Sequence, residues 1–168
     1  MKDLFGSEEI RALSWKQPFA SLMLHDKIET RKWATKYRGL VLICVSQKEY
    51  TENELKALSG IKQLDRIMNI LSPFQIVQTC GKAIAIGRLV DCRPMTINDE
   101  DKAFIKFRPA WKECKKNKDG STRYVVKRLY CHVYQDIQPI KPFDFKGAQG
   151  WRKLNKNIID KIEIIKNV

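Results

Sequence analysis

The segment Ser14–Gly39, SWKQPFASLMLHDKIETRKWATKYRG, constrains this chain more than any other stretch. It combines a short apolar run with two tryptophans, glutamate and six basic side chains. Core elements contain few charges, because charged side chains are rarely buried without a partner. The segment therefore predicts a packed element whose ends open onto a basic groove lined by aromatic side chains.

The length and composition predict one globular domain. The chain has 168 residues, of which 43% are hydrophobic and 30% are charged, the profile of a soluble globular protein. We expect a single domain over residues 1–168, with a basic insertion at about residues 96–123. The formal net charge of +13 favours a polyanionic partner, because basic side chains that bind phosphates release condensed counterions.

The cysteines and histidines do not form a metal-binding pattern. The five cysteines are scattered without a CxxC pair, and only His25 and His132 accompany them, so we expect no metal and no cofactor. Residues 1–10 contain acidic side chains and no apolar stretch, unlike a signal peptide. No apolar run approaches the roughly 18 residues of a membrane span. We expect a cytoplasmic protein in a reducing compartment, with no membrane partner.

Two apolar runs, Gly39–Val45 and Lys82–Cys92, predict buried strands, the second with a bulge at Gly87. Thr51 and Glu54 have the spacing of a helix capping box. A helix is expected from there to Leu58, closed by Gly60, and a second helix up to Pro73.

The remaining segments are shorter. Residues 8–14 predict a strand leading to Pro18, the first residue of a helix to about Leu24. Residues 117–121 predict a turn, and residues 124–133 a strand. Pro139 and Pro142 are expected to break the following chain into short pieces, and residues 155–168 fit either helix or strand. The sum predicts an α+β domain, a small β-barrel flanked by short helices.

Lys27, Glu29, Thr30 and Arg31 are the first candidates for chemistry. A lysine beside a carboxylate and a guanidinium could act as a base if burial lowers its pKa. The alternative is a surface turn whose charges merely pair. No Ser/His/Asp set is supported, because the chain has only two histidines.

Aromatic side chains near arginine and lysine are typical of sites that hold unstacked bases. Trp33, next to Arg31 and Lys32, is the best candidate, and Trp15, Tyr37 and Trp151 are the others. The alternative is that these rings belong to the core. Residues 147–150 (GAQG) are either a ligand-approaching loop or a plain turn. Residues 112–118 (KECKKNK) are either a solvated loop or a phosphate-contacting arm.

Several of these segments resemble the ASCH domain family, named for homology to activating signal cointegrator 1. The resemblance is carried by SWKQPFASL at residues 14–22, by Ile28-Glu29, Arg31 and Trp33, by KYRG at residues 36–39, and by Pro142 with KGAQGW at residues 146–151. Together these motifs bracket residues 10–154. Trp15 and Phe19 depart from the family pattern, and the connection before Lys27 is shorter than usual.

The resemblance implies a PUA-like β-barrel with a cleft beside the first helix, a fold associated with RNA binding. Some short ASCH-like bacterial proteins are amidohydrolases that deacetylate N4-acetylcytidine with a lysine, a threonine three residues later and a distant glutamate. Lys27 and Thr30 have that spacing, and Glu100 is the candidate for the third position.

Three functions follow as hypotheses. The first is binding of RNA, single-stranded nucleic acid or a nucleoside in a basic cleft. The second is the amidohydrolase, and the third is a protein-interaction module in transcription or translation. The residues expected to bind nucleic acid are Lys16, Gln17, Glu29, Arg31, Lys32, Trp33, Arg38, Gln149 and Trp151.

Overall fold

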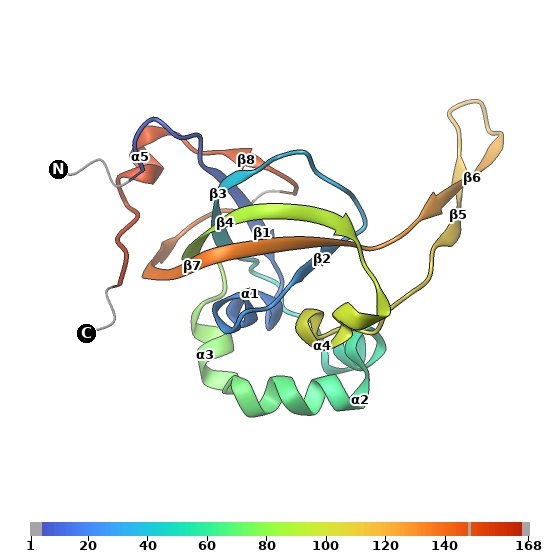
Figure 1. Ribbon diagram of the computed structural model, residues 1–168, viewed down its shortest axis with the longest axis horizontal. Coiled ribbons are helices and arrows are strands. Elements are labelled where there is room, and N and C mark those ends of the chain that lie inside the picture. Colours follow the sequence, from blue (N-terminus) through green and yellow to red (C-terminus); the bar gives the residue numbers. More distant parts are fainter. Residues whose placement is uncertain (1–4, 148, 166–168) are drawn as a thin grey trace.

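The structure is a computed structural model that describes residues 5–147 and 149–165. Its main element is a curled six-stranded sheet, a half-barrel with helices α1 to α4 gathered on one side (Figure 1). Strands β1 and β3 pair in parallel, and all other neighbours are antiparallel. The order across the sheet is β2 (Glu29–Arg31), β7 (Tyr130–Asp144), β4 (Lys82–Pro94), β3 (Gly39–Val45), β1 (Arg11–Trp15) and β8 (Arg152–Lys153). The predicted α+β class and small barrel are confirmed.

The central strand β3 is apolar throughout because both of its faces are covered. Val41 and Ile43 point into one hydrophobic core, whereas Leu42 and Cys44 point into a second core on the opposite face. Successive side chains of a strand alternate between faces, so a strand buried on both sides is a continuous apolar run. The first core lies between the sheet and the helices and contains Leu22 and Ile67.

The helices are α1 (Phe19–Leu22), η1 (Met23–His25), α2 (Glu52–Ile70), α3 (Pro73–Gln78), η2 (Ile97–Asp99), α4 (Glu100–Ala103) and α5 (Lys156–Ile159). The capping box at the start of α2 is confirmed, since Thr51 and Glu54 each bond to the backbone N–H of the other. Gly60 interrupts α2 with a φ of 75°, a conformation that glycine adopts without steric cost. The predicted break between two helices therefore lies inside this element.

The prediction of short pieces after residue 138 is wrong, because β7 runs through both Pro139 and Pro142. The carbonyl of Pro139 accepts a hydrogen bond from Ile165 N and so faces away from β4. The backbone nitrogen of Pro139 points to the same side as its carbonyl, away from β4. The lack of an N–H at this position therefore costs no hydrogen bond between β7 and β4. The tail combines both of the expected structures, with α5 followed by an isolated bridge from Ile164 to Ile140.

The expected strand at residues 124–133 is also wrong, because it is two strands of different sheets. Strand β6 (Thr122–Lys127) pairs with β5 (Trp111–Lys116) in a hairpin, and β7 begins only at Tyr130. The predicted turn at residues 117–121 joins β5 to β6. It is confirmed by the hydrogen bond from Asn117 N to Ser121 O and by the φ of 83° at Gly120. The bulge expected at Gly87 coincides with a register shift between β4 and β7.

Asp99 holds the turn that leaves β4. Its carboxylate accepts two hydrogen bonds from Arg93, at 2.8 and 2.6 Å, and two from the backbone and hydroxyl of Thr96, both at 2.8 Å. The Asp99 side chain is only 7% exposed. The hydrogen bonds from Arg93 are the main reason why the pKa of Asp99 lies far below its usual 3.8.

We expect Asp99→Asn to lower the free energy of unfolding by about 1–3 kcal/mol near pH 7, the cost of losing hydrogen bonds to a charged group. A lowered acid pKa stabilises the fold above the unfolded value and loses this effect as the pH falls. The difference from wild type should therefore shrink below about pH 4 in urea unfolding experiments. Asp65→Asn, at an exposed position of α2, is the control, and a pH-independent difference would contradict this account.

Candidate functional site

Two adjoining cavities form a cleft beside α1 and β2. The large cavity, of about 730 Å³, lies between the end of β1, the loop after β3 and residues 145–150. The small cavity, of about 360 Å³, lies between α1 and β2. The side chains that line both cavities are Lys16, Arg31, Trp33 and Tyr50. These volumes lie in the range of small-molecule sites, so the cleft can enclose a ligand the size of a nucleotide.

A row of charges forms the base of the small cavity. Alternate residues of an extended segment share a face, so β2 and the residues before it place Lys27, Glu29 and Arg31 on one side. Lys27 Nζ lies 2.9 Å from Glu29 Oε2 and donates a second bond to the carbonyl of Ile28 at 2.9 Å. Arg31 Nε lies 2.8 Å from Glu29 Oε1, and its terminal nitrogen donates to Ser14 O at 2.9 Å.

Burial sets the protonation behaviour of this row. The side chains of Lys27 and Glu29 are 1% and 8% exposed. Loss of solvation lowers the pKa of Lys27, and Glu29 opposes this effect only in part. Burial alone would raise the pKa of Glu29, but the cations Lys27 and Arg31 outweigh it and hold that pKa below the usual 4.5. The result is an ionised carboxylate that holds an amine with an increased tendency to lose its proton.

An aromatic cluster fixes the ring at the junction of the two cavities. The Trp33 ring packs edge-on against His132, with ring centres 4.8 Å apart, and against Trp151, at 5.7 Å. The Tyr37 ring packs against the Trp151 ring, with ring centres 5.2 Å apart. Nε2 of the buried His132 lies 3.1 Å from the carbonyl of Trp33, and burial lowers the pKa of this histidine. Trp33 is therefore held rigidly, with part of its surface open to the cleft.

Residues 145–147, 149 and 150 line the large cavity from the segment between β7 and β8. Gly147 packs so closely on β1 that a Cβ at this position would collide with the hydroxyl of Ser14. Lys146 and Gln149 line the cavity from this segment, and Lys48 lines it from the loop after β3. The glycine-containing segment therefore packs against β1 and contributes to the wall of the large cavity.

Comparisons with known proteins bear on the fold. No family model and no curated protein matches the chain. Among solved structures, it is similar to the crystal structure of a tyrosine-to-phenylalanine mutant of ZmASCH from Zymomonas mobilis. The match covers 93% of this chain and 100% of that chain, with a TM-score of 0.51 and 12% sequence identity. The chain has an ASCH-like fold. Of the segments that carried the resemblance, residues 14–22 and 28–33 contribute lining residues to the cleft, together with Lys146, Gly147, Gln149 and Gly150.

Most of the predicted site residues line the cleft. These are Lys16, Lys27, Glu29, Thr30, Arg31, Lys32, Trp33 and Gln149. Trp151 lies behind Trp33 and supports it. Trp15 is both core and cavity wall, since it is 3% exposed and its ring lies 5.2 Å from the Arg31 guanidinium.

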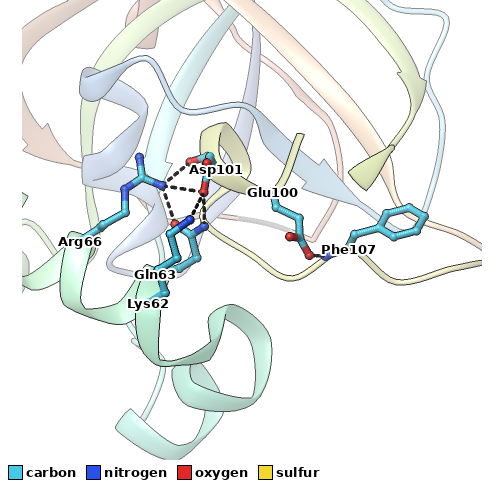
Figure 2. A network of polar contacts seen from close by, with 6 residues as sticks. All are labelled: Lys62, Gln63, Arg66, Glu100, Asp101 and Phe107. Atoms are coloured by element: carbon cyan, nitrogen blue, oxygen red, sulfur yellow. Dashed lines mark hydrogen bonds and ion pairs between the residues drawn. The ribbon is translucent and has the colours of Figure 1, made fainter. Parts of the chain in front are cut away.

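Three of the predicted residues lie elsewhere. Gln17 is fully buried, and its amide bonds to Ser21 and to the hydroxyl of Thr79, so it anchors α1 rather than a ligand. Arg38 is exposed and bonds to the carbonyls of Thr35 and Tyr37. Glu100 accepts a bond from Phe107 N beside the contact between α2 and α4 (Figure 2), so Glu29, not Glu100, is the carboxylate beside Lys27.

Sequence reasoning missed Ser14, Tyr50 and Lys48 as lining residues. Tyr50 and Lys48 lie in the loop between β3 and α2, where no local pattern marks a site. Among the described residues, no group of three or more His, Cys, Asp or Glu side chains could hold a metal ion. None of the helices within residues 5–147 and 149–165 is long and apolar enough to cross a membrane.

The buried amine predicts a distinctive pH dependence. Because the pKa of Lys27 is lowered on folding, the unfolded chain binds more protons between the folded pKa and the usual 10.5. The free energy of unfolding of wild type should therefore rise with pH relative to Lys27→Met in urea titrations from about pH 6 to about pH 9. Lys102→Met, which alters an exposed lysine, should run parallel to wild type. Parallel profiles for Lys27→Met would contradict the lowered pKa.

Proposed function

We propose that the cleft binds a nucleotide unit of RNA, with the base against Trp33 and the phosphates on the surrounding basic side chains. The observation that carries this proposal is the junction of the two cavities, where a rigid aromatic ring lies beside Arg31 and Lys16. Base–aromatic stacking and charge-assisted bonds to phosphate are the two interactions that nucleic-acid sites combine.

The charge of the cleft supports the same proposal. Its described lining includes one acidic residue, Glu29, whose charge is compensated by Lys27 and Arg31. The further basic residues Lys16, Lys32, Lys48 and Lys146 line the walls. Lys16 lies 3.8 Å from Glu54 and Lys32 lies 3.7 Å from Glu113, whereas Lys48 and Lys146 have no ion pair within the described residues. An excess of cations around a cleft attracts anionic ligands.

Binding of a short single-stranded RNA, measured by fluorescence anisotropy, tests the proposal. Trp33→Ala should weaken binding about tenfold or more, because stacking contributes about 1–3 kcal/mol per base. Lys16→Ala should weaken binding and reduce the slope of log K against log salt by about 0.7, the value for one phosphate contact on a single strand. Lys156→Ala removes the same charge from α5 and is the matched control. Equal affinities for all three variants and wild type would refute the proposal.

A second function is suggested by Lys27, which is buried at the small cavity, and by Thr30, which lines the same cavity from β2. In an amidohydrolase acting on N4-acetylcytidine, the Thr30 hydroxyl oxygen would bond to the acetyl carbonyl carbon while the neutral Lys27 amine accepts its proton. The carbon–nitrogen bond then breaks, and this proton passes to the departing N4 amine. Water finally hydrolyses the acetyl ester and releases acetate. Glu29 would hold the Lys27 amine in place.

If the chain has this activity, Lys27→Met and Thr30→Ala should each reduce the release of cytidine by about a hundredfold or more, the usual contribution of a general base or nucleophile. Thr30→Ser keeps the hydroxyl and should retain activity. The wild-type rate should rise with pH as Lys27 loses its proton. Chromatographic assay of cytidine and acetate provides the measurement, and unchanged rates in Lys27→Met would exclude Lys27 as the base.

A further inference from the structure

The hairpin of β5 and β6 is a separate two-stranded sheet that projects from the body of the protein (Figure 1). Its register pairs Trp111 with Lys127, Glu113 with Val125 and Lys115 with Arg123. Residues directly opposite each other share a face of the ladder, so these six side chains form one face, which we call the inner face. The outer face pairs Lys112 with Val126, Cys114 with Tyr124 and Lys116 with Thr122.

The inner face adjoins the cleft. Lys32, which lines the small cavity, has its Nζ 3.7 Å from Glu113 Oε1 and 5.7 Å from the centre of the Trp111 ring. The Trp111 N–H donates to the same Glu113 oxygen at 2.9 Å. The Arg108 guanidinium stacks on Trp111 at 4.0 Å. The inner face is therefore continuous with the basic wall of the cleft.

Farther out on the inner face, two cations lie directly opposite each other. Lys115 and Arg123 form a cross-strand pair, and like charges in this position repel. Glu113 is engaged by Lys32 and Trp111, and neither cation has an ion pair with an acidic residue in the described part of the chain. An anion bound between them would relieve the repulsion and complete their hydrogen bonds.

We propose that the inner face of the hairpin binds the sugar-phosphate backbone of a single-stranded polynucleotide, one of whose bases occupies the cleft. The inference rests on the proposed function and adds where the strand beyond the bound nucleotide lies. Each strand of the hairpin has six residues and spans about 20 Å, a length that accommodates several nucleotides. Single strands fit because a base must leave its stack to enter the cleft.

The chain offers a matched pair of variants. Lys115→Ala/Arg123→Ala removes two charges from the inner face, and Lys112→Ala/Lys116→Ala removes two charges from the outer face of the same hairpin. All four side chains are exposed, and circular dichroism checks that the fold is kept. The probes are cytidine monophosphate and labelled RNA and DNA single strands of about 12 nucleotides, within the range of single-strand sites.

The inner-face variant should bind the strands about tenfold more weakly than wild type, and its salt slope should fall by about 1.4 for two lost phosphate contacts. Its affinity for cytidine monophosphate should not change. The outer-face variant should bind the strands within about twofold of wild type. A preference for RNA over DNA would identify the source of the strand.

If both hairpin variants lose the same affinity for the strands, diffuse electrostatic attraction explains the binding and the proposal is overturned. If neither variant loses affinity, the proposal is overturned as well. The variant Trp33→Ala distinguishes a failure of the hairpin proposal from a failure of the proposed function of the cleft. If it loses the strands while the hairpin variants keep them, the cleft remains the site and the hairpin proposal fails. If only the inner-face variant loses them, the hairpin binds the strand and the proposed function of the cleft fails.

Discussion

The buried charge row of Lys27, Glu29 and Arg31 is the interaction on which the cleft depends. Moving charges out of water is costly, and breaking such a pair leaves an uncompensated charge, so these groups must stay in a fixed arrangement. The row also joins separate elements. Arg31 bonds to Ser14 at β1, β2 pairs with β7, and the N–H of Ile28 bonds to the carbonyl of Lys102 in α4. The walls of the small cavity are thereby held together.

The aromatic cluster complements the charge row. Trp33 lies immediately beyond β2, and its position depends on His132 of β7 and on Trp151, which precedes β8. These contacts reach from one edge of the curled sheet to the other. A rigid ring and a rigid set of charges would need little reorganisation in the proposed binding of a nucleotide, so less ordering entropy would oppose it.

Local sequence patterns predicted those features that depend on neighbouring residues. The capping box of α2, the interruption at Gly60 and the apolar run of β3 belong to this group. The errors arose where a distant element decides the outcome. Pro139 is tolerated because its missing N–H faces the outer edge of β7, and Gln17 is buried because Thr79 comes from a remote segment.

The choice of carboxylate is a different case. The spacing of two residues between Lys27 and Glu29 already indicated that these side chains lie together, because it places both on one face of an extended segment. Glu100 was favoured by the resemblance, which called for a distant glutamate. By contrast, nothing in the local sequence of Tyr50 or Lys48 indicated the cleft, because the path of the loop after β3 places them there.

The strand order has a consequence for synthesis of the protein. Strand β1 pairs with β8, and residues 145–147, 149 and 150, which come shortly before β8, line the large cavity. A ribosome-bound chain that lacks this segment has the charge row and Trp33 but neither Trp151 nor the far wall of the cleft. Because this segment is synthesised after nearly all of the sheet, the wall of the large cavity cannot be complete until the segment has left the ribosome.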